Sequence, residues 1–170
     1  MSQVARWFDR KFDLSFSEEL YPNLCVRVRG TPARLEELLR DVPGDILTRN
    51  VRPKWSVQEH AGHLLDLEDL WKRRAEQYVK GEPELAVTDL ENTKTNDANH
   101  NAQPLWRILG AFRRARTEFV TQLSGYQPEF FGRTALHPRL KTPLRLVDHL
   151  YFVAEHDDHH LARIWAMINE

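Results

Sequence analysis

The sequence predicts an all-α fold, a four-helix bundle with long crossover loops. Four long segments carry apolar residues at the three- and four-residue spacing of an amphipathic helix. Capping residues or prolines precede them, and no segment alternates apolar and polar residues convincingly, as a half-buried strand would. Amphipathic helices joined by loops bury their apolar stripes against one another, so a bundle is expected.

The first helical segment follows an amino-terminal arm. Residues 1–30 hold several aromatic side chains without a clean period, so we expect an irregular arm with one helical turn, packed on the body. Thr31 and Pro32 have the pattern of an N-cap and a first helical residue. Leucines at helical spacing follow, and Pro43 ends the segment.

The second and third helices are separated by a long polar stretch. Ser56 and Glu59 form a capping box, which begins a helix that runs to about Lys80. The polar residues 81–102 are predicted to form a loop whose length is typical of functional loops. The third helix lies between Pro104 and Gly125, where apolar residues form a continuous stripe.

The fourth helix is the longest. A loop over residues 126–141 precedes it, and Thr142 and Pro143 are expected to cap it. The apolar pattern then continues to Asn169 without an internal glycine or proline.

Composition limits the classes of function. The 170 residues are 41% apolar and 29% charged with a net charge of −1, which suits a single domain spanning 1–170 and gives no reason to expect a nucleic-acid partner. No stretch approaches the roughly 18 apolar residues of a membrane span, and no signal peptide is evident, so we expect no membrane association and a cytoplasmic location. The single Cys25 excludes an internal disulfide and a thiolate-rich zinc site, and we expect it to be a small buried apolar residue.

Two histidines of the fourth helix have the spacing of metal ligands. His156 and His160 are four residues apart, so their side chains project from one helical face. Two such imidazoles can bind one metal ion, but further ligands must come from another helix. The sequence His-Asp-Asp-His-His differs from the His-Glu-x-x-His pattern of metalloproteases, and a protease is therefore disfavoured.

The second helix offers the missing ligand. His63 can meet His156 and His160 if the two helices face each other inside the bundle. His60, three residues earlier, remains an alternative to His63. Three imidazoles with open positions are typical of a catalytic metal site, whereas a structural site takes four protein ligands.

Two blocks of sequence resemble a known family. Residues 55–68 contain Trp-Ser-x-x-Glu-x-x-x-His-Leu-x-Asp, and residues 156–164 contain His-x-x-x-His followed by an apolar turn. Together with His137 and Pro138 ahead of the last helix, they look like the DinB/YfiT-like superfamily. The resemblance covers about residues 31–168.

The resemblance implies a bundle that holds one divalent metal ion, often zinc or nickel. Transferred position by position, the ligands are His63, His156 and His160. It also implies a small-molecule substrate and a low-molecular-weight thiol as cosubstrate, because related proteins include thiol-dependent transferases and isomerases, while others are labelled hydrolases. Ala162 and Arg163 depart from the Gly-Gln that often follows the ligand pair.

Other polar residues have two interpretations each. Asp66 and Glu59 either orient an imidazole or are solvated carboxylates. His149 either lines the cavity or is a hydrogen-bonded core residue, and the roles of His100 and His137 stay open. His159 is expected to point away from the site, Asp157 and Asp158 to lie on the surface, and Arg73 and Arg74 to be far from the metal. A basic pocket for an acidic thiol is expected from Arg49, Arg52, Arg139, Lys141 and Arg145.

The sequence therefore predicts a metal-dependent enzyme, first a thiol-dependent S-transferase and alternatively a hydrolase. It assigns no catalytic residue. A non-catalytic, stress-linked metal-binding protein is the other class, and a homodimer is expected from apolar residues left on long helices. The five tryptophans are expected mostly in the core.

Overall fold

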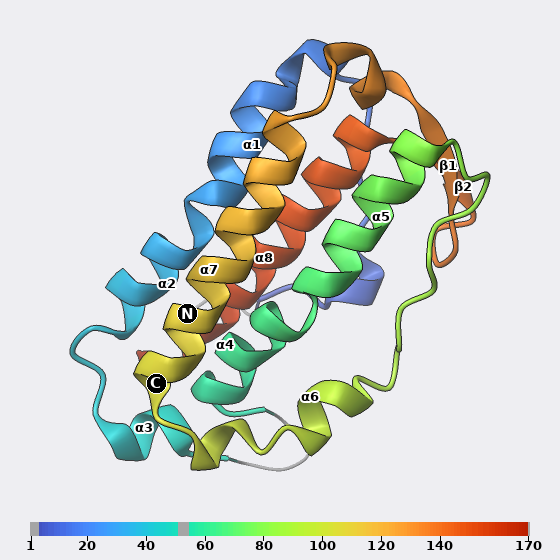
Figure 1. Cartoon of the computed structure of the whole chain (residues 1–170). Coiled ribbons are helices and arrows are strands. Elements are labelled where there is room, and N and C mark those ends of the chain that lie inside the picture. Colours follow the sequence, from blue (N-terminus) through green and yellow to red (C-terminus); the bar gives the residue numbers. More distant parts are fainter. Residues whose placement is uncertain (1–3, 51–54, 170) are drawn as a thin grey trace.

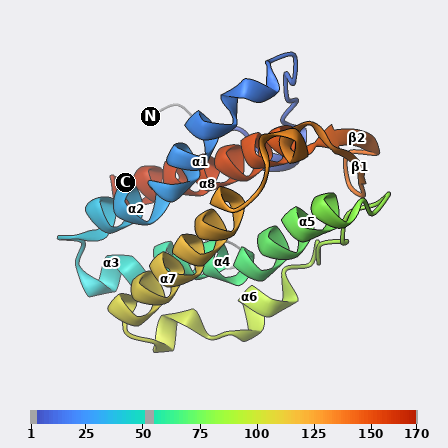
Figure 2. The same cartoon turned by 45° about the horizontal axis from the view of Figure 1, so that its top comes forward.

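The computed structural model describes residues 4–50 and 55–169. The predicted four-helix bundle is confirmed, with two of its four rods each built from two consecutive helices (Figures 1 and 2). The helices are α1 Tyr21–Arg29, α2 Thr31–Leu39, α3 Gly44–Thr48, α4 Val57–Asp66, α5 Glu68–Lys80, α6 Thr93–Asp97, α7 Leu105–Ser124 and α8 Leu146–Ile168.

The first rod consists of α1 and α2, which follow each other end to end along one edge of the bundle (Figure 1). Residues 1–30 were expected to form an irregular arm with one helical turn. The nine-residue α1 is longer than this expectation, while residues 4–20 contain only short turns. The expectation that Thr31 is an N-cap is wrong. It is the first residue of α2 and its hydroxyl donates to Asp157 at 2.6 Å.

The second rod consists of α4 and α5, which are separated at Leu67. The predicted capping box is present, because the Ser56 hydroxyl accepts from the Glu59 amide while the Glu59 carboxylate accepts from the Ser56 amide. A single helix over this span was expected. The break was not evident because the apolar pattern continues across it.

The connection from α5 to α7 runs back along the side of the bundle, as Figure 1 shows. It contains α6 and a turn at His100–Ala102, so it is more ordered than the predicted loop. Near its start, the Leu85 amide donates to Leu136, which joins this connection to the segment before α8.

That segment is a β-hairpin, which corrects the prediction of a loop without strands. Strand β1, Thr134–His137, pairs antiparallel with β2, Thr142–Arg145. Helix α8 begins after Arg145, whose backbone N–H donates to the carboxylate of Asp148. The expectation that Thr142 and Pro143 cap this helix is therefore wrong.

The core lies along α8, which contacts α1, α2, α4 and α5. Trp71 is buried there, and Trp7 packs against the same cluster. Trp106 and Trp165 are 72% and 53% exposed, so the expectation of core tryptophans fails for these two. Cys25 also packs against this cluster but is only half-buried, and burial raises the pKa of its thiol to about 11.

Candidate metal centre

The three histidines expected to bind metal come together between α4 and α8. Each of His63, His156 and His160 offers a ring nitrogen, and these three atoms lie within 4.8 Å of one another. The i, i+4 spacing places two rings on one face of α8, while α4 supplies the third from the opposite side. All three side chains are buried.

Neighbouring side chains orient two of these rings. The Nδ1 atom of His63 lies 3.0 Å from the Thr95 hydroxyl, which donates to Asp66 at 2.9 Å. A hydroxyl that donates to Asp66 accepts from His63, so the proton of His63 belongs on Nδ1 and its Nε2 keeps a free lone pair. The predicted role of Asp66 in orienting an imidazole therefore has a path through Thr95.

His60 is the partner of His160 and was considered as an alternative ligand. The two Nδ1 atoms lie 2.9 Å apart, and the Nε2 of His160 lies 3.2 Å from the Nε2 of His156. His63 belongs to the converging group and His60 does not. The structure thus places His60 behind His160, where it can hold that ring through the nitrogen that faces away from the centre.

The three converging imidazole nitrogens suit a divalent cation. His156 faces His160 through Nε2, and its Nδ1 atom is buried without a hydrogen-bond partner in the described part of the chain. Burial is the main cause that lowers the pKa of His63 to about 4 and the pKa values of His156 and His160 well below the ordinary value. All three rings are therefore neutral near pH 7, and neutral imidazole is the form that binds metal.

A cavity of about 210 Å³ opens beside the three histidines. Its wall is largely aromatic and contains several cationic side chains. The aromatic residues of the wall include Trp7, Phe8, Trp55, Trp71 and Phe152, and the arginines are Arg74, Arg139 and Arg163. Asp89 also lines the cavity, so a substrate beside the histidines would lie among apolar rings, three arginines and one acidic group.

One expectation about the cavity is wrong. His159 was expected to point away, but it lines the cavity, with its ring centroid 5.6 Å from that of Trp7. Arg74, which was expected to be far from the metal unless the substrate is long, lines the same cavity and is 1% exposed. Trp7 and Arg163 were not proposed as site residues, and no local pattern in the sequence distinguishes them.

The predicted basic pocket is realised only in part. Arg139 lines the cavity. Arg145 instead pairs with Asp148, and Arg49 and Lys141 are exposed. Arg52 lies outside the described residues.

Three further polar residues do not line this cavity. His149 is fully buried in the core, but neither ring nitrogen has a hydrogen-bond partner within the described ranges. His100 contacts Asp66 at 2.8 Å through Nε2. Glu59 completes the helix cap and also accepts from Asn50, so its carboxylate is engaged at the amino-terminal end of α4.

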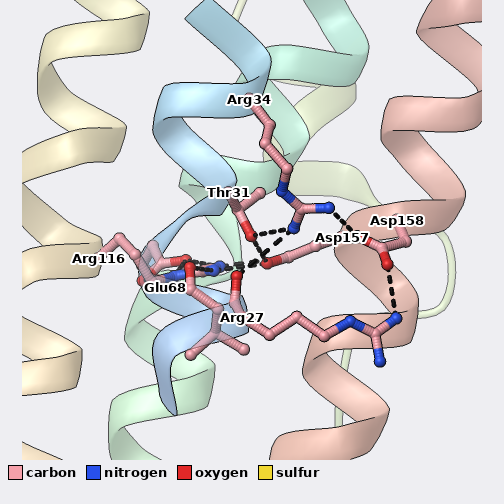
Figure 3. Close-up of polar contacts among 8 residues, drawn as sticks. Arg27, Thr31, Arg34, Glu68, Arg116, Asp157 and Asp158 are labelled. Carbon is pink, nitrogen blue, oxygen red and sulfur yellow. Dashed lines mark hydrogen bonds and ion pairs between the residues drawn. The ribbon is translucent and has the colours of Figure 1, made fainter. Parts of the chain in front are cut away.

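The prediction that Asp157 lies on the surface is wrong. Asp157 is 0% exposed and is joined to Arg116 of α7, while Arg116 also donates to Glu68 of α5 (Figure 3). Asp158 is partly exposed and pairs with Arg27 and Arg34. Both carboxylates therefore connect the helix that carries two of the histidines to the rest of the bundle.

Comparison with known proteins identifies the family and the fold. The model of the DinB superfamily matches residues 27–164, and the chain belongs to this superfamily. The structure is similar to YfiT from Bacillus subtilis, a probable metal-dependent hydrolase with an unusual four-helix bundle topology, with a TM-score of 0.80, 19% identity and coverage of 93% of this chain and 91% of YfiT.

A second similar structure is the mycothiol-dependent maleylpyruvate isomerase. Its TM-score is 0.67 at 8% identity, and the match covers 84% of this chain but 59% of the isomerase. Both likenesses concern the fold. The search of curated proteins gives no match. None of the helices in the described ranges has the length and apolar character needed to cross a membrane.

Proposed function

We propose that this protein binds one divalent metal ion, zinc or nickel, through His63, His156 and His160, and that it is a metal-dependent enzyme acting on a small molecule. The observation that carries the proposal is the convergence of three buried, neutral imidazoles beside a cavity. Three protein ligands leave positions open, as in catalytic sites.

A divalent ion bound in this way supplies Lewis acidity and lowers the pKa of a water or thiol that binds to it. The chain's own groups have separate tasks. Thr95 and His60 orient two of the rings, and the aromatic wall limits the access of water. The arginines of the wall attract an anionic substrate or cosubstrate.

Thiol-dependent transfer is the first candidate reaction and hydrolysis is the second. The structural likeness to a mycothiol-dependent isomerase and the cationic cavity support the first. The likeness to YfiT, a probable metal-dependent hydrolase, supports the second. Both reactions use an activated nucleophile beside an electrophile, so the histidine geometry serves either.

Metal analysis of protein purified without a histidine tag tests the binding proposal. We expect about one divalent ion per chain in the wild type and almost none in His156→Ala or His160→Ala. His159→Ala is the matched control, because this histidine lines the cavity but lies outside the converging group. Full occupancy in both ligand variants would contradict the assignment.

Turnover of a chromogenic electrophile, chlorodinitrobenzene, with and without cysteine or glutathione separates the two reactions. Acceleration by thiol that is lost in His156→Ala supports the transferase. If no thiol accelerates the wild type while a nitrophenyl ester is hydrolysed in a metal-dependent way, the hydrolase is the correct alternative.

A further inference from the structure

Two guanidinium groups line the cavity without an ion pair to any described carboxylate, although Asp89 lines the same cavity. Arg74 on α5 and Arg139 after β1 both line the cavity, and neither forms an ion pair with any described residue. Arg74 is 1% exposed, and burial lowers the pKa of its guanidinium to about 10. A buried cation without a counter-ion is costly. Two guanidinium groups without counter-ions beside a cavity therefore indicate a binding site for an anion.

The hydrogen-bond donors of Arg74 and Arg139 outnumber the acceptors around them. Arg74 uses Nε and Nη2 to donate to the carbonyl of Ala86, at 3.0 and 2.8 Å, which leaves Nη1 directed at His137. The Nη2 atom of Arg139 is buried and has no hydrogen-bond partner in the described part of the chain. Two guanidinium edges are therefore left without acceptors.

His137 adds a third donor. Its Nδ1 accepts from the backbone N–H groups of Arg139 and Leu140, at 3.3 and 3.2 Å. A neutral imidazole that accepts at Nδ1 carries its hydrogen on Nε2, and this atom lies 3.2 Å from Nη1 of Arg74. Two donors thus face each other, an arrangement that an anion beside them, accepting from both, would relieve.

The position of these donors relates them to the histidine centre. Arg139 lies over the ring of Trp7 at 5.6 Å, and Arg74 lies over the ring of Trp71, also at 5.6 Å. The rings of Trp7 and Trp71 are 5.1 and 5.7 Å from the ring of His156. Each guanidinium is therefore separated from His156 by one indole.

We propose that Arg74, His137 and Arg139 form a carboxylate-binding subsite that anchors one end of a small organic acid in the cavity. Two carboxylate oxygens match the forked donors of the guanidinium groups. The aromatic wall accommodates the apolar body of the ligand, and its other end reaches the three histidines. Only this last point rests on the proposed function, because the subsite itself consists of groups outside the metal centre.

Calorimetric titration with benzoate, and with benzamide as its uncharged counterpart, tests the subsite. The full chain is used as isolated and after treatment with a chelator, and the metal content of each sample is measured. We expect benzoate to bind both forms, benzamide to bind at least tenfold more weakly, and Arg139→Gln to weaken benzoate binding tenfold or more. Arg74→Lys, which keeps the charge but loses the fork, should also weaken binding.

Arg113 serves as the control. Arg113→Gln removes an exposed charge of α7 and should bind benzoate within about twofold of the wild type. The subsite is disproved if Arg139→Gln binds benzoate as the wild type does, if benzamide binds equally well, or if benzoate does not bind. Binding that disappears with the metal disproves it as well, because the carboxylate then sits on the ion.

The design separates this inference from the proposed function. Benzoate binding that depends on Arg139 in protein that never holds metal would support the subsite and contradict the metal-dependent function. Protein that binds one metal ion per chain, but whose benzoate binding is unchanged by Arg139→Gln, would support the metal site and disprove the subsite.

Discussion

Arg116 of α7 and Asp157 of α8 form an ion pair from which solvent is excluded, with side chains 1% and 0% exposed. Arg116 also donates to Glu68 and, at 2.8 Å, to the carbonyl of Val28, while Thr31 donates to Asp157 (Figure 3). Because Asp157 directly follows His156, this network fixes the turn of α8 that presents a proposed ligand.

Replacing Arg116 with methionine should destabilise the protein strongly. The substitution keeps an unbranched side chain but leaves two buried carboxylates, Glu68 and Asp157, without their cation. Breaking a buried pair from one side costs about 3–5 kcal/mol. Urea unfolding at equilibrium measures the loss.

The control for this variant is Arg113→Met, one turn earlier on α7. Arg113 pairs with Glu36 at the surface, where both side chains are more than a third exposed. We expect a loss of at most about 1 kcal/mol in the free energy of unfolding. Equal losses in the two variants would contradict the importance of the buried network.

His63 and His60 should differ in their effect on metal binding. His63→Ala removes a proposed ligand and should abolish stoichiometric binding. His60→Ala removes only the partner of the His160 Nδ1 atom, so the ion should remain with roughly tenfold lower affinity. Competition with a chromophoric chelator gives both values, and the reverse order would make His60 the ligand from α4.

Thr95→Val tests the path from Asp66 to His63. Valine has the same shape but cannot relay the hydrogen bond between the imidazole and the carboxylate. We expect metal affinity to fall by about 10- to 100-fold. Thr117→Val is the control because its hydroxyl bonds only to a carbonyl of its own helix, and an equal effect there would exclude the relay.

Gly62→Ala should destabilise the bundle although alanine favours helices. A Cβ at this position would lie 2.3 Å from the ring of His100, which is held in turn by Asp66. Forcing that ring aside costs about 1–3 kcal/mol. Urea unfolding should show the loss.

Gly110→Ala in α7 provides the matched substitution without a clash, since the nearest atom is 3.5 Å away on a flexible arginine. It should stabilise the protein by up to about 1 kcal/mol. A Gly62→Ala variant as stable as Gly110→Ala would show that His100 moves without cost.

Helical periodicity predicted the long elements because each buries a continuous stripe. It missed α1, where Leu24 and Val28 are buried but the apolar Val26 is 68% exposed, so the face is short and irregular. It missed the hairpin because each strand has only four residues and one contains Pro143. Strands this short contain too few alternating positions for the pattern to be recognised in the sequence.

The candidate site was predictable where one helix determines it. Helix geometry alone places His156 beside His160. The choice between His60 and His63 depends on how α4 is rotated against α8, which local sequence does not determine. The same holds for Asp157, because α8 is enclosed by neighbouring helices on several sides and a carboxylate there finds Arg116.

The wall formed by Trp7 and Phe8 belongs to a segment that precedes the helical rods. This segment is fastened to α8 across a large sequence separation, since Arg10 and Glu155, which are bonded to each other, are 145 residues apart. Because the i, i+4 spacing on α8 sets how His156 and His160 lie beside each other, changes in these first residues can reshape the cavity while that pair keeps its geometry. In the proposed enzyme, substrate preference can therefore change through substitutions in this segment, separately from the helices that carry the three histidines.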